Sequence, residues 1–295
     1  MKRLTILLVV TALLAVPAGA LSVKKKSIKR IANPTTTNVA APTVYQQAVK
    51  AYENDDFSTA ARLINQHLEK NPNHADGWAY KAAIYSENDN PHEALKAIDM
   101  ARQCRIDQNK TEFLNWIYFT RSTINLQLSD TVSAIEDLNM ALRYDPTDVD
   151  SYFRRGNLFK RMRRFDEALV DYGMMVQYDP KEIEGYLGIG TVSGSLKDRK
   201  ASIKAFSKAI ELDPNNAEPY ALRAVEYYND NNFKNAAKDI INALERESDN
   251  ARALWLLEYI KEDIKEYEDV AKEVTKVFND KAKKSKDPSW LDLLK

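Results

Sequence analysis

The 295-residue chain is poor in cysteine, histidine and glycine, and each shortage excludes a class of protein. A single cysteine, Cys104, rules out a disulfide scaffold, and three histidines argue against a multi-histidine metal centre. Eight glycines are too few for a glycine-rich phosphate loop or a hairpin-rich β fold, and they favour helices. Neither sign of charge is in surplus, because Lys and Arg number 43 and so do Asp and Glu. This balance argues against a nucleic-acid partner.

Residues 1–20 have the order of a secretory signal peptide. Lys2 and Arg3 precede an apolar run over residues 4–16, and the small residues Ala18-Gly19-Ala20 follow. We expect cleavage after Ala20 and export, most naturally to a bacterial periplasm. The alternative is an uncleaved anchor, since the apolar run extended to Leu21 approaches the length that spans a bilayer, and only then would the chain contact a membrane. Residues 21–42 are basic and then rich in Thr, Pro, Asn and Ala, which predicts a flexible linker.

A period of about 34 residues governs the rest of the chain. Pro146, Pro180 and Pro214 are evenly spaced at this period and each follows an aspartate, while Pro72 belongs to the same series if six residues are inserted near 107–115. The period predicts an array over residues 43–284 of about seven repeats, numbered one to seven: 41–74, 75–108, 115–148, 149–182, 183–216, 217–250 and 251–284. Within a repeat, counted from its first residue, position 4 is bulky and positions 8 and 20 are small, as in Tyr152, Gly156 and Ala168. Fixed large and small positions indicate two closely packed helices.

The repeated pattern resembles the tetratricopeptide repeat family. Repeat four is the best match, with the sequence SYFRRGNLFKRMRRFDEALVDYGMMVQYDP. Repeat two lacks its proline, repeat three has Asn125 where an aromatic residue is usual at position 11, and repeat seven has Glu258 at the small position 8. The resemblance implies an all-α fold, a right-handed superhelical solenoid of antiparallel helix pairs.

The last segment, residues 285–295, predicts one short helix that covers the end of the array. Asp287 would cap this helix and Pro288 would be its first residue. Trp290, Leu293 and Leu294 would then pack on repeat seven. The alternative is a peptide motif that occupies the groove of the solenoid.

No set of residues predicts catalysis, and we expect neither an enzyme nor a cofactor. His67 falls on a core position and is expected to be partly buried, whereas His74 and His92 fall in turns and are expected to be solvated. Cys104 is expected to be a small buried hydrophobe rather than a reactive thiol.

The candidate binding wall comes from the family resemblance. In this family, positions 2, 5, 6, 9, 12 and 13 of the first helix line the concave face. In repeats three and four, the candidate partner-binding residues at these positions are Trp116, Phe119, Thr123, Phe153, Arg154, Asn157 and Lys160. We expect Trp116 and Phe119 to be apolar anchors and the basic residues to bind polar or acidic groups. The alternative for the six bases between Arg154 and Arg164 is an ordinary solvated surface.

These features predict an exported scaffold or adaptor that binds a protein or peptide, with an acidic ligand favoured, in its concave groove. The alternative is an accessory protein that binds carbohydrate or an envelope polymer by stacking aromatic residues on sugar rings. Aromatic residues beside arginines would favour the peptide, and aromatic residues beside acids and amides would favour the sugar.

Overall fold

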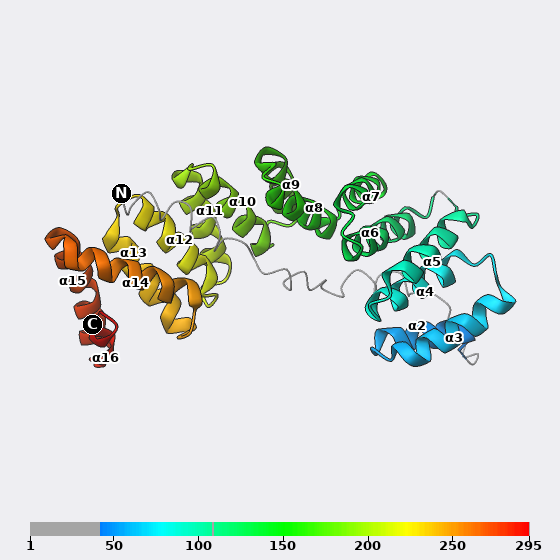
Figure 1. Ribbon diagram of the computed structural model, residues 1–295, viewed down its shortest axis with the longest axis horizontal. Coiled ribbons are helices and arrows are strands. Elements are labelled where there is room, and N and C mark those ends of the chain that lie inside the picture. Colours follow the sequence, from blue (N-terminus) through cyan, green and yellow to red (C-terminus); the bar gives the residue numbers. More distant parts are fainter. Residues whose placement is uncertain (1–41, 108, 295) are drawn as a thin grey trace. The chain divides into compact units, whose positions relative to one another are not determined.

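The computed structural model describes residues 42–107 and 109–294 of the chain. The predicted signal peptide and nearly all of the predicted linker lie outside the described residues. Within them the secondary structure is helical, and the helices follow one another in consecutive pairs, as Figure 1 shows from α2 to α15. The predicted all-α fold of helix pairs is confirmed.

Each predicted repeat contains one pair of helices. The pairs are α2 (Val44–Glu53) with α3 (Phe57–Lys70), α4 (Ala75–Glu87) with α5 (Pro91–Gln103), α6 (Thr111–Gln127) with α7 (Thr131–Tyr144), α8 (Val149–Arg161) with α9 (Phe165–Tyr178), α10 (Ile183–Ser195) with α11 (Arg199–Leu212), α12 (Glu218–Asn229) with α13 (Phe233–Arg246), and α14 (Ala251–Glu266) with α15 (Glu268–Ser285). A short helix, α16 (Ser289–Asp292), follows.

The helices gather into two compact bodies, with the boundary inside α8 between Leu158 and Phe159. The core of the N-terminal body contains Ile64, Tyr80, Ile98, Trp116 and Ile117. A separate core in the C-terminal body is formed by residues of α12 to α15, among them Ile240, Leu256 and Phe278. Each body therefore buries an apolar core of its own.

The turn inside each of the first six repeats places position 15 in the left-handed backbone region. The residues with positive φ there are Asp55, Asp89, Ser129, Arg163, Lys197 and Asn231. Glycine adopts this conformation most readily, yet none of the described glycines has a positive φ. Side chains cap the following helices: Asp56, Asp130, Asp198 and Asn232 each accept a hydrogen bond from the backbone N–H three residues on.

The glycines lie instead where helices approach closely. A β-carbon on Gly188 would overlap the ring of Tyr172, and one on Gly190 would overlap the ring of Phe206. Positions 6 and 8 of repeat five thus let α10 lie against aromatic rings of α9 and α11.

A hydrogen bond joins several repeats to the one before. The aromatic residue at position 4 donates to the carbonyl oxygen of the proline six residues earlier, from Trp78 Nε1 to Pro72 at 2.7 Å and from Tyr186 Oη to Pro180 at 3.3 Å. Tyr152 and Tyr220 donate in the same way to Pro146 and Pro214. We call this bond the proline tie. It links two positions that the sequence repeats, the bulky position 4 and the terminal proline.

Repeats three and seven depart from this arrangement. Ile106 stands where repeat two would have its proline, and Tyr118 stacks on Tyr144 at a centroid distance of 5.6 Å. The inserted residues also lengthen α6, whose extra first turn buries Phe113 and Leu114.

At the end of the chain, the C-terminal segment packs against the core of the C-terminal body through Trp290, Leu291, Leu293 and Leu294.

Candidate functional site

The predicted wall brings α6 and α8 together at Arg154. Arg154 Nη1 donates to Thr123 Oγ1 at 2.8 Å, and Thr123 Oγ1 donates in turn to the Phe119 carbonyl oxygen at 3.2 Å. The guanidinium carbon of Arg154 lies 4.5 Å from the centroid of the Phe119 ring. One cation therefore contacts both a hydroxyl group and an aromatic face of the preceding repeat.

Arg154 is an unusual cation, because it is buried. Only 6% of the residue is exposed, and burial lowers the pKa of its guanidinium to about 10. The carboxylates of Asp150 and Asp148 offset part of that shift. Among the described residues no carboxylate forms an ion pair with Arg154. A guanidinium has five N–H donors, so Thr123 satisfies only a small part of its hydrogen-bonding capacity.

The expectation that Trp116 and Phe119 are surface anchors is wrong. Trp116 is 3% exposed and packs on Tyr80 of α4, with ring centroids 5.2 Å apart. Phe119 is 7% exposed and lies beneath Arg154. Trp116 belongs to the core of the N-terminal body, and neither ring has enough exposed area to anchor a partner. The alternative, in which the bases between Arg154 and Arg164 form an ordinary solvated surface, is also wrong for Arg154, because Arg154 is buried.

The other residues of the predicted wall are partly exposed. Phe153 and Asn157 are half-buried on α8, in the N-terminal body. Lys160 also lies on α8 but belongs to the C-terminal body, and burial lowers the pKa of its ammonium group. The structure thus brings Phe119, Thr123 and Arg154 into contact and leaves Phe153 and Asn157 accessible from the same helix.

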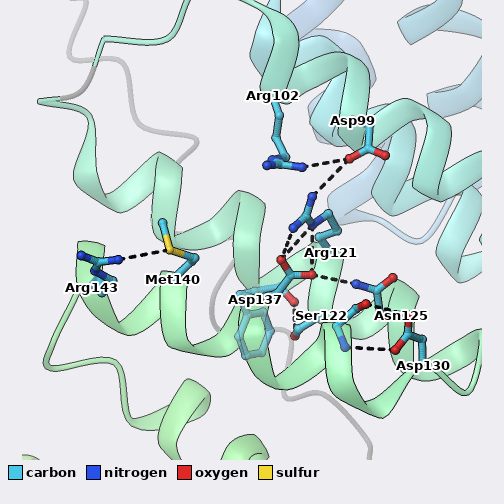
Figure 2. Close-up of polar contacts among 11 residues, drawn as sticks. Asp99, Arg102, Arg121, Ser122, Asn125, Asp130, Asp137, Met140 and Arg143 are labelled. Atoms are coloured by element: carbon cyan, nitrogen blue, oxygen red, sulfur yellow. Dashed lines mark hydrogen bonds and ion pairs between the residues drawn. The ribbon is translucent and has the colours of Figure 1, made fainter.

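A second polar cluster joins α5, α6 and α7. Figure 2 shows Arg121 between Asp99 and Asp137. Arg121 Nε donates to Asp137 Oδ1 at 2.8 Å, and Asn125 Nδ2 donates to Asp137 Oδ2 at 2.7 Å. Arg121 Nη1 reaches Asp99 Oδ1 at 3.3 Å. Burial raises the pKa of Asp137, while its bonds to Arg121 and Asn125 oppose that shift.

This cluster was missed from the sequence, although a signal was present. Arginine at position 7 and aspartate at position 23 occur together in repeats three, four and six. In repeat six Arg223 Nε donates to Asp239 Oδ2 at 2.7 Å and Arg223 Nη2 to Asp239 Oδ1 at 2.9 Å. The pair therefore binds the two helices of a repeat to each other. Asn125, which departs from the family pattern, adds a third bond to the same carboxylate.

The histidines and the cysteine have structural surroundings. His67 is half-buried, as expected, and its Nε2 lies 3.1 Å from Nδ1 of His74. His74 is not merely solvated, because it caps α4 by accepting from the Gly77 N–H at 3.1 Å. Cys104 is half-buried at the end of α5, and burial raises the pKa of its thiol.

The described residues contain neither a metal-binding cluster nor a membrane-spanning helix. No group of three His, Cys, Asp or Glu in that part of the chain could hold a metal ion. None of the described helices is long and apolar enough to span a membrane.

Antiparallel helix pairs that recur at a fixed period define a helical-repeat solenoid. Residues 63–96 and residues 183–216 match models of the tetratricopeptide repeat, and the second match has the bounds of repeat five. A comparison with curated proteins finds no match.

Solved structures show the same fold. The C-terminal part of a tetratricopeptide repeat-containing protein from Cytophaga hutchinsonii is 19% identical, with a TM-score of 0.68 over 85% of this chain and 99% of that one. A tetratricopeptide repeat protein from Parabacteroides merdae is 18% identical, with a TM-score of 0.57 over 91% of this chain and 99% of that one. YrrB, described as having an unusual peptide-binding site, is 18% identical, with a TM-score of 0.56 over 67% and 98%. The fold is that of a tetratricopeptide-repeat solenoid.

Proposed function

We propose that this protein is an exported, non-enzymatic scaffold that binds a protein or peptide through the wall formed by α6 and α8. The observation that supports this most directly is the buried guanidinium of Arg154. An acidic side chain or a terminal carboxylate of the partner would supply the ion pair that no described residue supplies. The partly exposed Phe153 and Asn157 would contact the ligand beside it, in place of the buried Trp116 and Phe119.

The position of the aromatic residues also favours a peptide over a sugar. Phe119 lies under an arginine, and Trp78 lies under Lys81 with the ammonium nitrogen 5.0 Å from the ring centroid. A sugar ring stacked on these faces would have to displace a cation from each. Helical repeats in general contact mainly their neighbours in the array, which suits such folds to an extended partner.

A binding experiment with designed peptides tests the site. The chain from residue 21 onward would be titrated with fluorescent peptides that are acidic, neutral or basic but otherwise matched. We expect the acidic peptides to bind most tightly and Arg154→Met to weaken them at least about tenfold, which corresponds to about 1.4 kcal/mol. Arg143→Met, at an exposed position of α7, is the matched control and should leave affinity unchanged. Equal binding by a correctly folded Arg154→Met variant would overturn the proposed site.

Export is tested separately by the mass of the mature protein. The order of residues 1–20 predicts cleavage between Ala20 and Leu21. Intact-mass measurement of protein recovered from a bacterial envelope should therefore show a chain that starts at Leu21. A mass that retains residues 1–20 would mean an anchored protein instead.

A further inference from the structure

Position 10 of the repeat is a buried aliphatic residue in five of the seven repeats, and repeat six breaks the pattern. The five residues are Ile84, Ile124, Leu158, Val192 and Ile260, all of them core residues. Repeat six has Glu226 there, on α12, and only 7% of that residue is exposed. Repeat one has Lys50 there, which is exposed, so Glu226 puts a carboxyl group where the five other repeats bury an aliphatic side chain.

The neighbouring helix makes room for this carboxyl group. A β-carbon on Gly194 of α10 would overlap Glu226 Oε1, so the glycine leaves the space that the carboxyl group enters. The hydroxyl group of Ser202, close to the same point, donates to the Gly190 carbonyl oxygen at 2.8 Å. In the described part of the chain, no hydrogen bond or ion pair engages the carboxyl group of Glu226.

The charges on the surrounding helices do little to stabilise an ionised Glu226. The positive charge of Arg199 on α11 lowers the pKa of Glu226 by electrostatic attraction. Arg223 of α12 is bound to Asp239 of α13, and Asp263 of α14 accepts a hydrogen bond from Tyr228. Burial raises the pKa of Glu226 to about 7, and Arg199 offsets only part of this shift.

We propose that Glu226 is a proton-binding site that makes the packing of α12 against α10 depend on pH. When protonated, the side chain is neutral and packs much as the aliphatic residues do in the other repeats. Once ionised, it places a charge without an ion-pair partner in a largely buried site between two helices, which disfavours the packed arrangement. Gly194 and Val225 occupy positions 12 and 9, which line the concave face in the family that the repeats resemble, so loosening this joint would shift residues at two of those positions.

The sign of the effect follows from the direction of the shift. The pKa of Glu226 in the folded protein, about 7, is above its ordinary value of 4.5. The folded state therefore binds the proton more tightly than the unfolded state does. The stabilising effect of the proton is complete below pH 4.5 and is lost as pH rises towards 7.

The first measurement uses the unmodified protein. Carbon-13 NMR of protein labelled at glutamate carboxyl groups should show one residue titrating near pH 7, and Glu226→Gln identifies the signal by removing it. The amides of α10 and α12 should lose protection from hydrogen exchange across the same pH range, by up to about tenfold per pH unit after correction for the intrinsic rate. Titration of Glu226 at its ordinary value would overturn the proposal.

The second measurement compares variants. Glu226→Gln and Glu226→Ile should both keep α10 and α12 protected at pH 8, where the unmodified protein has loosened. Isoleucine is the residue at this position in three other repeats, so at least one of the two variants is expected to fold. Glu211→Gln, at an exposed position of α11, is the control and should retain the pH dependence. Equal loosening of the unmodified protein and the Glu226 variants would assign the effect to another group.

Discussion

At Gly190, helix α10 lies so near the ring of Phe206 that a side chain would not fit between them. Gly190→Ala should destabilise the protein by about 1–3 kcal/mol, because the added methyl group must displace a packed ring. Gly173 of α9 is the matched control, since no atom lies within 4 Å of the place its β-carbon would occupy. Gly173→Ala should stabilise the protein by about 0.5–1 kcal/mol, and urea unfolding of both variants measures the difference.

The two neighbouring histidines give a prediction of their own. The Gly77 N–H donates to His74 Nδ1, so the proton between the rings belongs to His67 Nε2. Burial lowers the pKa of His67, and the proximity of His74 lowers it further. Acid therefore favours the unfolded state, and the melting temperature should fall as pH drops below about 6.5.

A substitution of His74 can separate its role as a helix cap from its effect on the titration of His67. His74→Ser keeps an acceptor for the end of α4 but has no ring to protonate. Melts of this variant between pH 8 and pH 5 should depend less on pH than those of the unmodified protein. His92→Ser, at an exposed histidine, should change nothing. If both variants behave alike, the contact between His67 and His74 does not cause the acid sensitivity.

Among the elements, the turns inside the repeats carry avoidable strain. Lys197, at the turn between α10 and α11, has a φ of 64°. A left-handed backbone costs a residue with a side chain about 1–2 kcal/mol, so Lys197→Gly should stabilise the protein by about 0.5–1 kcal/mol after the added freedom of the unfolded chain is deducted. Lys204→Gly, inside α11, should cost about 1 kcal/mol. Thermal unfolding that moved both variants in the same direction would contradict the assignment of this strain.

The helices could be predicted from the sequence because period and proline position specify them directly. The regular spacing, the small positions and the Asp-Pro ends all follow from the packing of two helices. Proline ties could not be predicted, because a bulky residue at position 4 does not indicate that its polar tip donates to a carbonyl group. The repeat pattern also does not predict that Trp116 is buried. Position 2 lines the concave wall in the family, but here the lengthened α6 and Tyr80 enclose Trp116.

At the scale of the molecule, the junction between repeats six and seven lacks the proline tie. Ser248 stands in place of proline, and Leu254 in place of the aromatic residue. The backbone there already suits a proline, because Glu247 has φ −144° and ψ 97° while Asp213, before Pro214, has −137° and 92°. Repeat seven is therefore expected to open more readily than the repeats before it.

Restoring the tie gives the last prediction. Ser248→Pro should stabilise the protein by about 0.4–1 kcal/mol, and Leu254→Tyr in addition should contribute about 0.5–1.5 kcal/mol through the new hydrogen bond. Hydrogen exchange in α14 and α15 should slow accordingly. Leu254→Phe in the proline background is the control, since it adds a ring without a hydroxyl group. Equal exchange in the tyrosine and phenylalanine variants would show that the ring, not the hydrogen bond, is responsible.

The proline tie also bears on the order in which the chain acquires its structure. Donor and acceptor are close in sequence, as from Pro72 to Trp78, so the bond forms between near neighbours along the chain. A nascent chain that emerges from its N-terminus can close each tie once the next helix begins to emerge, without waiting for distant segments. Local contacts of this kind favour rapid, stepwise folding and shorten the time during which apolar faces are open to aggregation. The two junctions without a tie are then the points where such stepwise folding would pause.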